Sequence, residues 1–319
     1  MGKVVYNQYD IEASKIINDF LPDKVFDMHM HVTHRDTLYN EYKTFADYYD
    51  ETKLFYQDRK VRCNGIITPI RELKNPEELK KSMDLLNSEL DKYPDNVGET
   101  IVFPHDTVDG IKARLTHPAI RGLKCYCFYS ERKDCYQSTI DEFLPESAWE
   151  VANEKKLAIT LHIVKDEALA HPDNLNYIIE MSKKYPDAVL ILAHAARAFA
   201  SWTAFDMVDK LVDCENVWYD FSCICEVPAM LYILKKVGVG RCMWGTDYNV
   251  CTLLGKPISL ADRFYWLYKE NFPSDPDIRL GHIITEAFMA MRQTCILADM
   301  DKNQIEDFFY NNAARLVDR

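Results

Sequence analysis

Two histidines, His29 and His31, stand one residue apart in the stretch VFDMHMHV at positions 25–32. The apolar lead-in predicts a strand, on which alternate side chains point to the same face. Asp27, His29 and His31 would then share one face, with both imidazoles near the end of the strand. Two imidazoles placed in this way are suited to binding a first-row divalent metal such as zinc.

This HxH pair could equally belong to a polar strand end, so its meaning depends on the elements around it. Short apolar segments alternate with helical ones along the chain, which is typical of parallel strands joined by crossover helices. Eight such units in 319 residues predict an α/β (β/α)8 TIM barrel that forms a single domain over residues 1–319. An open doubly wound sheet is the alternative, but no glycine-rich phosphate loop follows the first strand. The strands are expected at residues 25–32, 62–70, 98–105, 119–127, 157–164, 188–195, 216–223 and 241–248.

Helices are expected between these strands and at both ends of the chain. The final one has Asp301 as a candidate N-cap, with Gln304 three residues later. The expected helices cover residues 1–24, 75–92, 107–116, 141–156, 173–185, 199–213, 226–237, 281–298 and 302–317.

Two long connections interrupt the pattern, at residues 33–60 after the first strand and at 249–280 after the eighth. Both extended loops would leave the same rim of the barrel, so we expect them to be insertions that cap the site or form a subunit contact. The first is rich in tyrosine and phenylalanine, a pattern that also fits a surface helix packed by its aromatic side chains. The second contains three prolines and is expected to be irregular.

Ionisable residues gather at the predicted strand ends, which converge on one rim of a barrel. His29, His31 and His162 could supply nitrogen ligands, and the Asp247 carboxylate would partly offset the charge of the cation. Such a set leaves a position open for water, whose pKa a bound metal lowers toward about 7. Asp247 could accept the proton of that water, and His194 could polarise a substrate carbonyl. Asp247 and His194 are therefore the candidate catalytic residues.

The ordered set resembles the amidohydrolase superfamily, and in particular its amidohydrolase-related (amidohydrolase 2) branch of metal-dependent TIM-barrel hydrolases. The matching features are D-x-H-x-H on the first strand, lysine on the fourth, histidine on the fifth and sixth, and aspartate on the eighth. The terminal IEDFFYNNAARLV is similar to the last helix of that branch, and the resemblance covers about residues 25–317. It implies that His29 and His31 bind a divalent metal, usually zinc. His162 would be a third or shared ligand, Asp247 a ligand and proton shuttle, and His194 a ligand of a second metal or of the substrate.

Lys124, toward the end of the fourth strand, has two possible roles in this resemblance. In binuclear relatives the corresponding lysine is carboxylated and bridges two metals, which requires a neutral amine. In mononuclear relatives it stays unmodified and contacts the substrate. We favour one ion, with Lys124 as a cationic substrate contact. Two ions are possible if Lys124 is carboxylated.

Further residues near the rim could bind the substrate: His105, Tyr126, Arg197, Trp244 and Tyr248. Arg197 and Lys124 together would suit a carboxylate or another anionic group. Each of these residues could instead be a packed aromatic or part of a surface ion pair.

These features predict a metal-dependent hydrolase that uses a metal-activated water on a C–N or C–O bond, of the amide or lactone type, in a small anionic substrate. One alternative is a metal-dependent, non-oxidative decarboxylase of a carboxylated ring compound. A second alternative is a metal-binding barrel without catalysis.

The composition of the chain limits the classes of partner and the location that we expect. The net charge of −12 and the lack of a basic stripe disfavour nucleic acid. The ten cysteines are sparse and include two C-x-C pairs, so we expect reduced thiols. No apolar run suits a signal peptide or a membrane span, so a cytoplasmic location without membrane contact is expected. A homodimer is plausible because symmetric oligomers are common.

Overall fold

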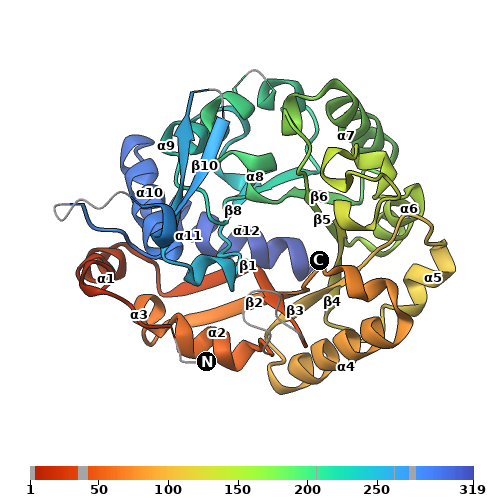
Figure 1. The fold of residues 1–319 in the computed structure, drawn as a ribbon, viewed down its shortest axis with the longest axis horizontal. Helices are drawn as coiled ribbons and strands as arrows, with labels where there is room; N and C mark the ends of the chain where they lie inside the picture. Colours follow the sequence, from red (N-terminus) through yellow and green to blue (C-terminus); the bar gives the residue numbers. More distant parts are fainter. Residues whose placement is uncertain (1–3, 35–41, 206, 262, 273–277) are drawn as a thin grey trace.

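The computed structural model describes residues 4–34, 42–205, 207–261, 263–272 and 278–319. Within them, eight parallel strands form one sheet in sequence order, ringed by helices such as α4, α6 and α7 (Figure 1). The strands are β1 (Lys24–Val32), β2 (Lys60–Ile67), β3 (Val97–Ile101), β4 (Ile120–Tyr126), β5 (Ala158–His162), β6 (Val189–Leu192), β7 (Val217–Asp220) and β8 (Cys242–Met243).

The sheet is closed by the chain that follows β8, which runs alongside β1. Met28 donates its backbone N–H to the carbonyl of Trp244 at 3.0 Å, and His31 donates to Tyr248 at 2.8 Å. Between them, the N–H of Asp247 donates to the carbonyl of His29. The predicted (β/α)8 barrel is thereby confirmed.

The helices follow the expected order, with cap residues at several of their starts. Asn7 caps α1, Asn75 caps α4 ahead of Pro76, and the predicted Asp301–Gln304 capping box is present at α11. A π-helical turn at Asp307–Asn311 joins α11 to α12. The helices are α1 (Gln8–Phe20), α2 (Phe45–Glu51), α3 (Lys53–Tyr56), α4 (Pro76–Lys92), α5 (Val108–Ala113), α6 (Glu146–Lys155), α7 (Pro172–Lys184), α8 (His194–Arg197), α9 (Val227–Val237), α10 (Ile283–Leu297), α11 (Lys302–Glu306) and α12 (Asn312–Val317).

Two of the expected elements were wrong. The described residues of segment 199–213 form only short 3-10 turns, at Ser201–Thr203 and Val208–Leu211, because the extended backbone of Ala200 breaks the helical path. The segment 249–280 contains a hairpin instead of irregular chain, in which β9 (Gly255–Leu260) pairs antiparallel with β10 (Arg263–Tyr268). Alternating aromatic residues in RFYWLY were the period-two signal for β10.

The described part of the 33–60 segment forms α2 and α3, which pack into the core through Phe45, Tyr48, Phe55 and Tyr56. This is the surface-helix interpretation of its aromatic residues. Tyr39, a further tyrosine of this segment, lies outside the described residues.

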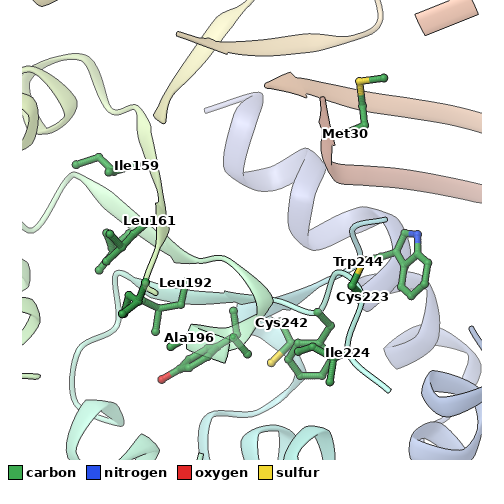
Figure 2. Packing of buried hydrophobic residues seen from close by; sticks show 14 of the residues in the cluster. Met30, Ile159, Leu161, Leu192, Ala196, Cys223, Ile224, Cys242 and Trp244 are labelled. Carbon is green, nitrogen blue, oxygen red and sulfur yellow. The ribbon is translucent and has the colours of Figure 1, made fainter. Parts of the chain in front are cut away.

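The main apolar core lies between strands and helices, where Leu161 of β5 and its register partner Leu192 of β6 lie side by side (Figure 2). A second cluster joins Met28, Ala158 and Val189 from three strands to Ala313 and Leu316 of α12. These three strands, β1, β5 and β6, are not all neighbours in the sheet, so their side chains can meet only inside the barrel. Because α12 packs against the same side chains, it covers one end of the barrel. Among the described helices, none has the length and apolarity needed to span a bilayer.

Substitution of Trp244 tests this packing of the core. Its indole is buried, stacks on Phe288 at 4.3 Å and donates to the Tyr56 hydroxyl at 3.1 Å. We expect Trp244→Ala to lower the free energy of unfolding by about 3–5 kcal/mol, through lost burial and an unfilled cavity. Leu297→Ala, at a 64% exposed position, should change it by less than about 0.5 kcal/mol. Urea titration would measure the free energy of unfolding of both variants. Equal losses in the two variants would contradict this packing.

Candidate metal centre

His29 and His31 of β1 meet Asp247, which follows β8, at one buried point. One ligand atom from each lies within 4.8 Å of the others. Asp247 Oδ1 is 3.1 Å from His31 Nε2 and 3.6 Å from His29 Nε2. Two imidazole nitrogens and a carboxylate oxygen facing one point are a ligand set for a divalent cation.

Asp27 does not share the face of the two histidines, so that expectation was wrong. The β1–β2 register shifts between Asp27 and Met30, and such a bulge breaks the strict alternation of side chains. Asp27 instead accepts hydrogen bonds from Tyr48 at 2.7 Å and from Thr246 at 2.5 Å. Burial raises the pKa of Asp27 to about 7. Through these hydrogen bonds, Asp27 connects β1 to α2 and to the chain after β8.

Asp220, at the end of β7, fixes the orientation of His29. Its Oδ2 lies 2.5 Å from His29 Nδ1, and Ser222 Oγ donates to the same oxygen at 2.9 Å. Burial, and to a smaller extent the nearby Lys124 cation, holds the pKa of His29 well below its usual value. The ring is therefore neutral. With Nδ1–H directed at Asp220, the lone pair of Nε2 is free for a metal. Sequence reasoning missed Asp220, although a carboxylate at a predicted strand end was visible.

Asp247 is ionised in this setting. Burial opposes its charge, but the hydrogen bond from His31 and the neighbouring histidines outweigh that effect and lower its pKa. His31 Nδ1 is buried without a hydrogen-bond partner among the described residues. A carboxylate held as an anion beside neutral His29 fits a bound cation.

His162 and His194 complete the ring of imidazoles without joining the three-residue cluster. The His194 ring lies 5.0 Å from that of His162 and 5.2 Å from that of His29. His194 Nδ1 is 2.9 Å from the Ser222 carbonyl, and its Nε2 is 3.8 Å from Asp247 Oδ2. His162 stacks on Tyr126 at 4.7 Å. Both histidines face the same cavity as the cluster.

Lys124 lies beneath the cluster, with Nζ 3.5 Å from His29 Nε2. Burial lowers the pKa of its ammonium group, partly offset by the Glu99 and Asp247 carboxylates. Burial likewise raises the pKa of Glu99 to about 7, while Asn64 and Thr160 donate to its Oε1. Glu99 is a second residue that sequence reasoning missed, because it precedes the end of its strand.

A cavity of about 390 Å3, hereafter the main cavity, opens over these residues. Its volume is in the range of small-molecule sites. Its cationic side chains are Lys124 and Arg197, and aromatic side chains form much of its wall. The aromatic residues are Tyr126, Phe128, Phe199, Phe264, Trp266 and Tyr268. The last three come from β10, so the hairpin after β8 contributes one wall.

Three of the suggested substrate contacts do not line the main cavity. His105 is exposed and pairs with Glu131 at 2.9 Å, because β3 ends at Ile101, well before it. Trp244 packs among core aromatics behind the barrel wall. The Tyr248 hydroxyl donates to Glu51 at 2.7 Å instead of facing a ligand. Lys124, Tyr126 and Arg197 do line it.

The sequence matches the family model for amidohydrolases over residues 26–319. The chain therefore belongs to the amidohydrolase family, as its resemblance suggested. No curated protein matches the sequence.

Solved structures with the same fold have varied chemistry. One is 5-carboxyvanillate decarboxylase LigW from Sphingomonas paucimobilis, with 13% identity over 93% of this chain and 99% of that chain and a TM-score of 0.56. Another is an amidohydrolase from Burkholderia multivorans with bound zinc, at 12% identity over 92% and 99% and a TM-score of 0.60. A third is a dihydroxybenzoic acid decarboxylase from Polaromonas sp. JS666 with bound manganese and 2-nitroresorcinol, at 13% identity over 92% and 97% and a TM-score of 0.55. At these identities the likeness shows the fold alone.

The contact between Asp220 and His29 predicts a loss of metal affinity on mutation. Asp220→Asn removes the carboxylate that orients the ring, so we expect zinc affinity to fall about 10- to 100-fold. Zinc titration against a competing chelator would measure this. Asp209→Asn, at a surface aspartate paired with Lys236, is the matched control and should leave zinc affinity unchanged. Equal affinities in wild type and Asp220→Asn would contradict the role of Asp220.

Proposed function

We propose that the protein is a metal-dependent hydrolase that cleaves a C–N or C–O bond, of the amide or lactone type, in a small anionic substrate. The observation that carries the proposal is the placement of Asp247. One of its oxygens faces His29 and His31, and the other lies toward His194 inside the main cavity. A carboxylate shared in this way is suited both to hold a cation and to move a proton.

Each residue has a part in this proposal. A divalent ion held by His29, His31 and Asp247 would supply Lewis acidity and lower the pKa of water. Asp247 accepts a proton from the attacking water and returns it to the leaving group. His194 donates its Nδ1–H to the Ser222 carbonyl, and in its imidazolium form it would also donate Nε2–H to the substrate carbonyl oxygen.

The proposed metal is a single zinc ion. Support comes from the mixed nitrogen and oxygen ligand set and from a zinc-containing structure of the same fold. We keep His162 as a further ligand because it lines the same cavity and contacts His194. Two ions would follow if Lys124 were carboxylated, and the lowered pKa of its amine permits this chemistry.

The anionic character of the substrate rests on two cations of the main cavity, Lys124, which is buried, and Arg197, which is half-buried. Among the described residues, no carboxylate lies within ion-pair distance of Lys124 or Arg197. Arg197 lies over the ring of Phe264 at 4.8 Å and donates to the Val164 carbonyl. Lys124 already has the Glu99 and Asp247 carboxylates near it, so a carboxylate on the substrate would pair chiefly with the Arg197 guanidinium.

Non-oxidative decarboxylation of a carboxylated ring is the second candidate. The aromatic wall of the main cavity and its two cations, Lys124 and Arg197, would fit a planar ring carboxylate. This fit favours decarboxylation. The two reactions leave different products. Hydrolysis incorporates one oxygen from water labelled with oxygen-18 into the product. Decarboxylation releases carbon dioxide and incorporates none.

We therefore expect the zinc-loaded protein, assayed against lactones, amides and ring carboxylates, to transfer solvent oxygen-18 into the product of its best substrate. Mass spectrometry of the product and detection of carbon dioxide would measure both outcomes. Carbon dioxide release without label would replace the hydrolase proposal by the decarboxylase one.

His194 is expected to act on the reaction and not on metal binding. His194→Asn should lower kcat by about 100- to 1000-fold, as loss of an oxyanion donor does. Bound zinc should stay at the wild-type level. His117→Asn, at a histidine next to Asp91 and away from the main cavity, is the control and should retain activity. An unchanged kcat in His194→Asn would show that His194 does not stabilise the reacting carbonyl.

Arg197 is expected to bind the anionic group of the substrate. Arg197→Met keeps an unbranched apolar stem but removes the guanidinium charge, so we expect KM to rise at least about tenfold. Steady-state kinetics would give KM and kcat separately. An unchanged KM would show that Arg197 does not contact the substrate.

A further inference from the structure

The backbone of Arg197 is held in an uncommon conformation. Arg197 ends α8, and all four residues of α8 have positive φ angles, between 45° and 65°. None of them is glycine, and residues with a Cβ seldom adopt this left-handed conformation unless the surrounding structure holds it. The Ala198 N–H donates to the His194 carbonyl at 2.8 Å, and the Thr203 hydroxyl donates to the Arg197 carbonyl at 3.1 Å. The fold thereby fixes the backbone of Arg197 at the wall of the main cavity.

The long side chain of Arg197 needs support of its own. It rotates about several bonds, so an unsupported arginine loses much conformational freedom when it binds an anion. Among the described residues, one guanidinium N–H donates to the Val164 carbonyl, and the guanidinium carbon lies 4.8 Å from the centre of the Phe264 ring. A guanidinium has five N–H donors, so these contacts leave donors for an anion in the main cavity.

The ring of Phe264 is itself held in place by the β9–β10 hairpin. Phe264 lies on β10 opposite Ser259 of β9, and its ring packs on that of Phe199 at 4.9 Å. Phe199 is buried and follows α8 by two residues. The hairpin is also joined to α10 by the ion pair between Lys256 and Glu286, at 3.0 Å. It therefore presents a fixed aromatic ring to the guanidinium.

We infer that Phe264 is a positioning residue for Arg197, which holds the guanidinium in advance where it pairs with the anionic group of the substrate. A guanidinium already in place loses less conformational freedom on binding, so the anion binds more tightly. The inference rests on the proposed function, because it takes Arg197 as the contact of the anion. Through Phe264, the hairpin after β8 takes part in anion recognition, although the phenyl ring carries no charge.

Direct binding tests this without the natural substrate. The probes are benzohydroxamate and its ortho, meta and para carboxy derivatives. The hydroxamate group chelates zinc, so it occupies the metal centre and leaves the added carboxylate for Arg197. Calorimetry on the zinc-loaded full chain would give each dissociation constant. We expect one carboxy derivative to bind at least about tenfold more tightly than benzohydroxamate, because its carboxylate forms a charge-assisted pair with Arg197.

Phe264→Leu should reduce this preference about three- to tenfold, the range expected when one long side chain is no longer held in advance. Phe264→Tyr keeps the ring and should retain the preference. In the Arg197→Met background, Phe264→Leu should have no further effect, because Phe264 acts through the guanidinium. Phe205→Leu, at a phenylalanine that packs on Tyr232 outside the main cavity, is the matched control and should retain the preference. Should Phe264→Leu fail to fold, Phe264→Met replaces it with the same expectation.

Three results would overturn the inference alone. They are a preference that is unchanged in Phe264→Leu, a loss in Phe264→Tyr as large as that in Phe264→Leu, and an effect of Phe264→Leu that persists in the Arg197→Met background. If no carboxy derivative bound more tightly than benzohydroxamate, or if Arg197→Met kept the full preference, Arg197 would not be the anion contact of the proposed function. The inference would then fail with it.

Discussion

The backbone pairing between β1 and the chain after β8 is the constraint on which both the barrel and its site depend. The hydrogen bond from Asp247 N–H to the His29 carbonyl closes the sheet. It also sets the Asp247 carboxylate next to the imidazoles of His29 and His31. Two segments more than two hundred residues apart therefore form one ligand set through main-chain geometry.

Buried charges around this junction balance one another. Asp247 is ionised next to neutral His29, Lys124 lies beneath both, and Asp220 orients His29 from the opposite side. Each of these groups would be costly to bury alone, and together they form a network in which a bound cation supplies the missing charge. Such a dense cluster of perturbed groups is typical of a functional site and unusual for a purely structural core.

The sequence was sufficient to predict the barrel and the convergence of His29, His31 and Asp247, but it also placed His162 among the ligands, and His162 lies outside the three-residue cluster. Apolar strands alternated regularly with helices, and the strand ends carried His29, His31 and Asp247. Side-chain direction was harder to predict. The bulge in β1 turned Asp27 outward, and the short β3 left His105 on the surface. Trp244 was expected at the rim only because it lies in the eighth predicted strand, 241–248, and nothing in the sequence tells a rim-facing tryptophan from one in the helix layer.

The residues that support the site were missed for a related reason. Asp220 and Glu99 act through contacts between strands, and a single sequence does not show which strand faces which. The β9–β10 hairpin was missed because the three prolines of segment 249–280 outweighed the alternation of Phe264, Trp266 and Tyr268 in the sequence reading. Local patterns therefore located the strand ends, whereas the network joining them required the fold.

The most direct test of this account is the metal content of the purified protein, measured by elemental analysis together with that of a His29→Ala, His31→Ala double variant. The account predicts about one equivalent of divalent metal per chain in the wild type and almost none in the variant. A folded wild-type protein that holds no metal after incubation with zinc would contradict it. So would a double variant that retains the full equivalent.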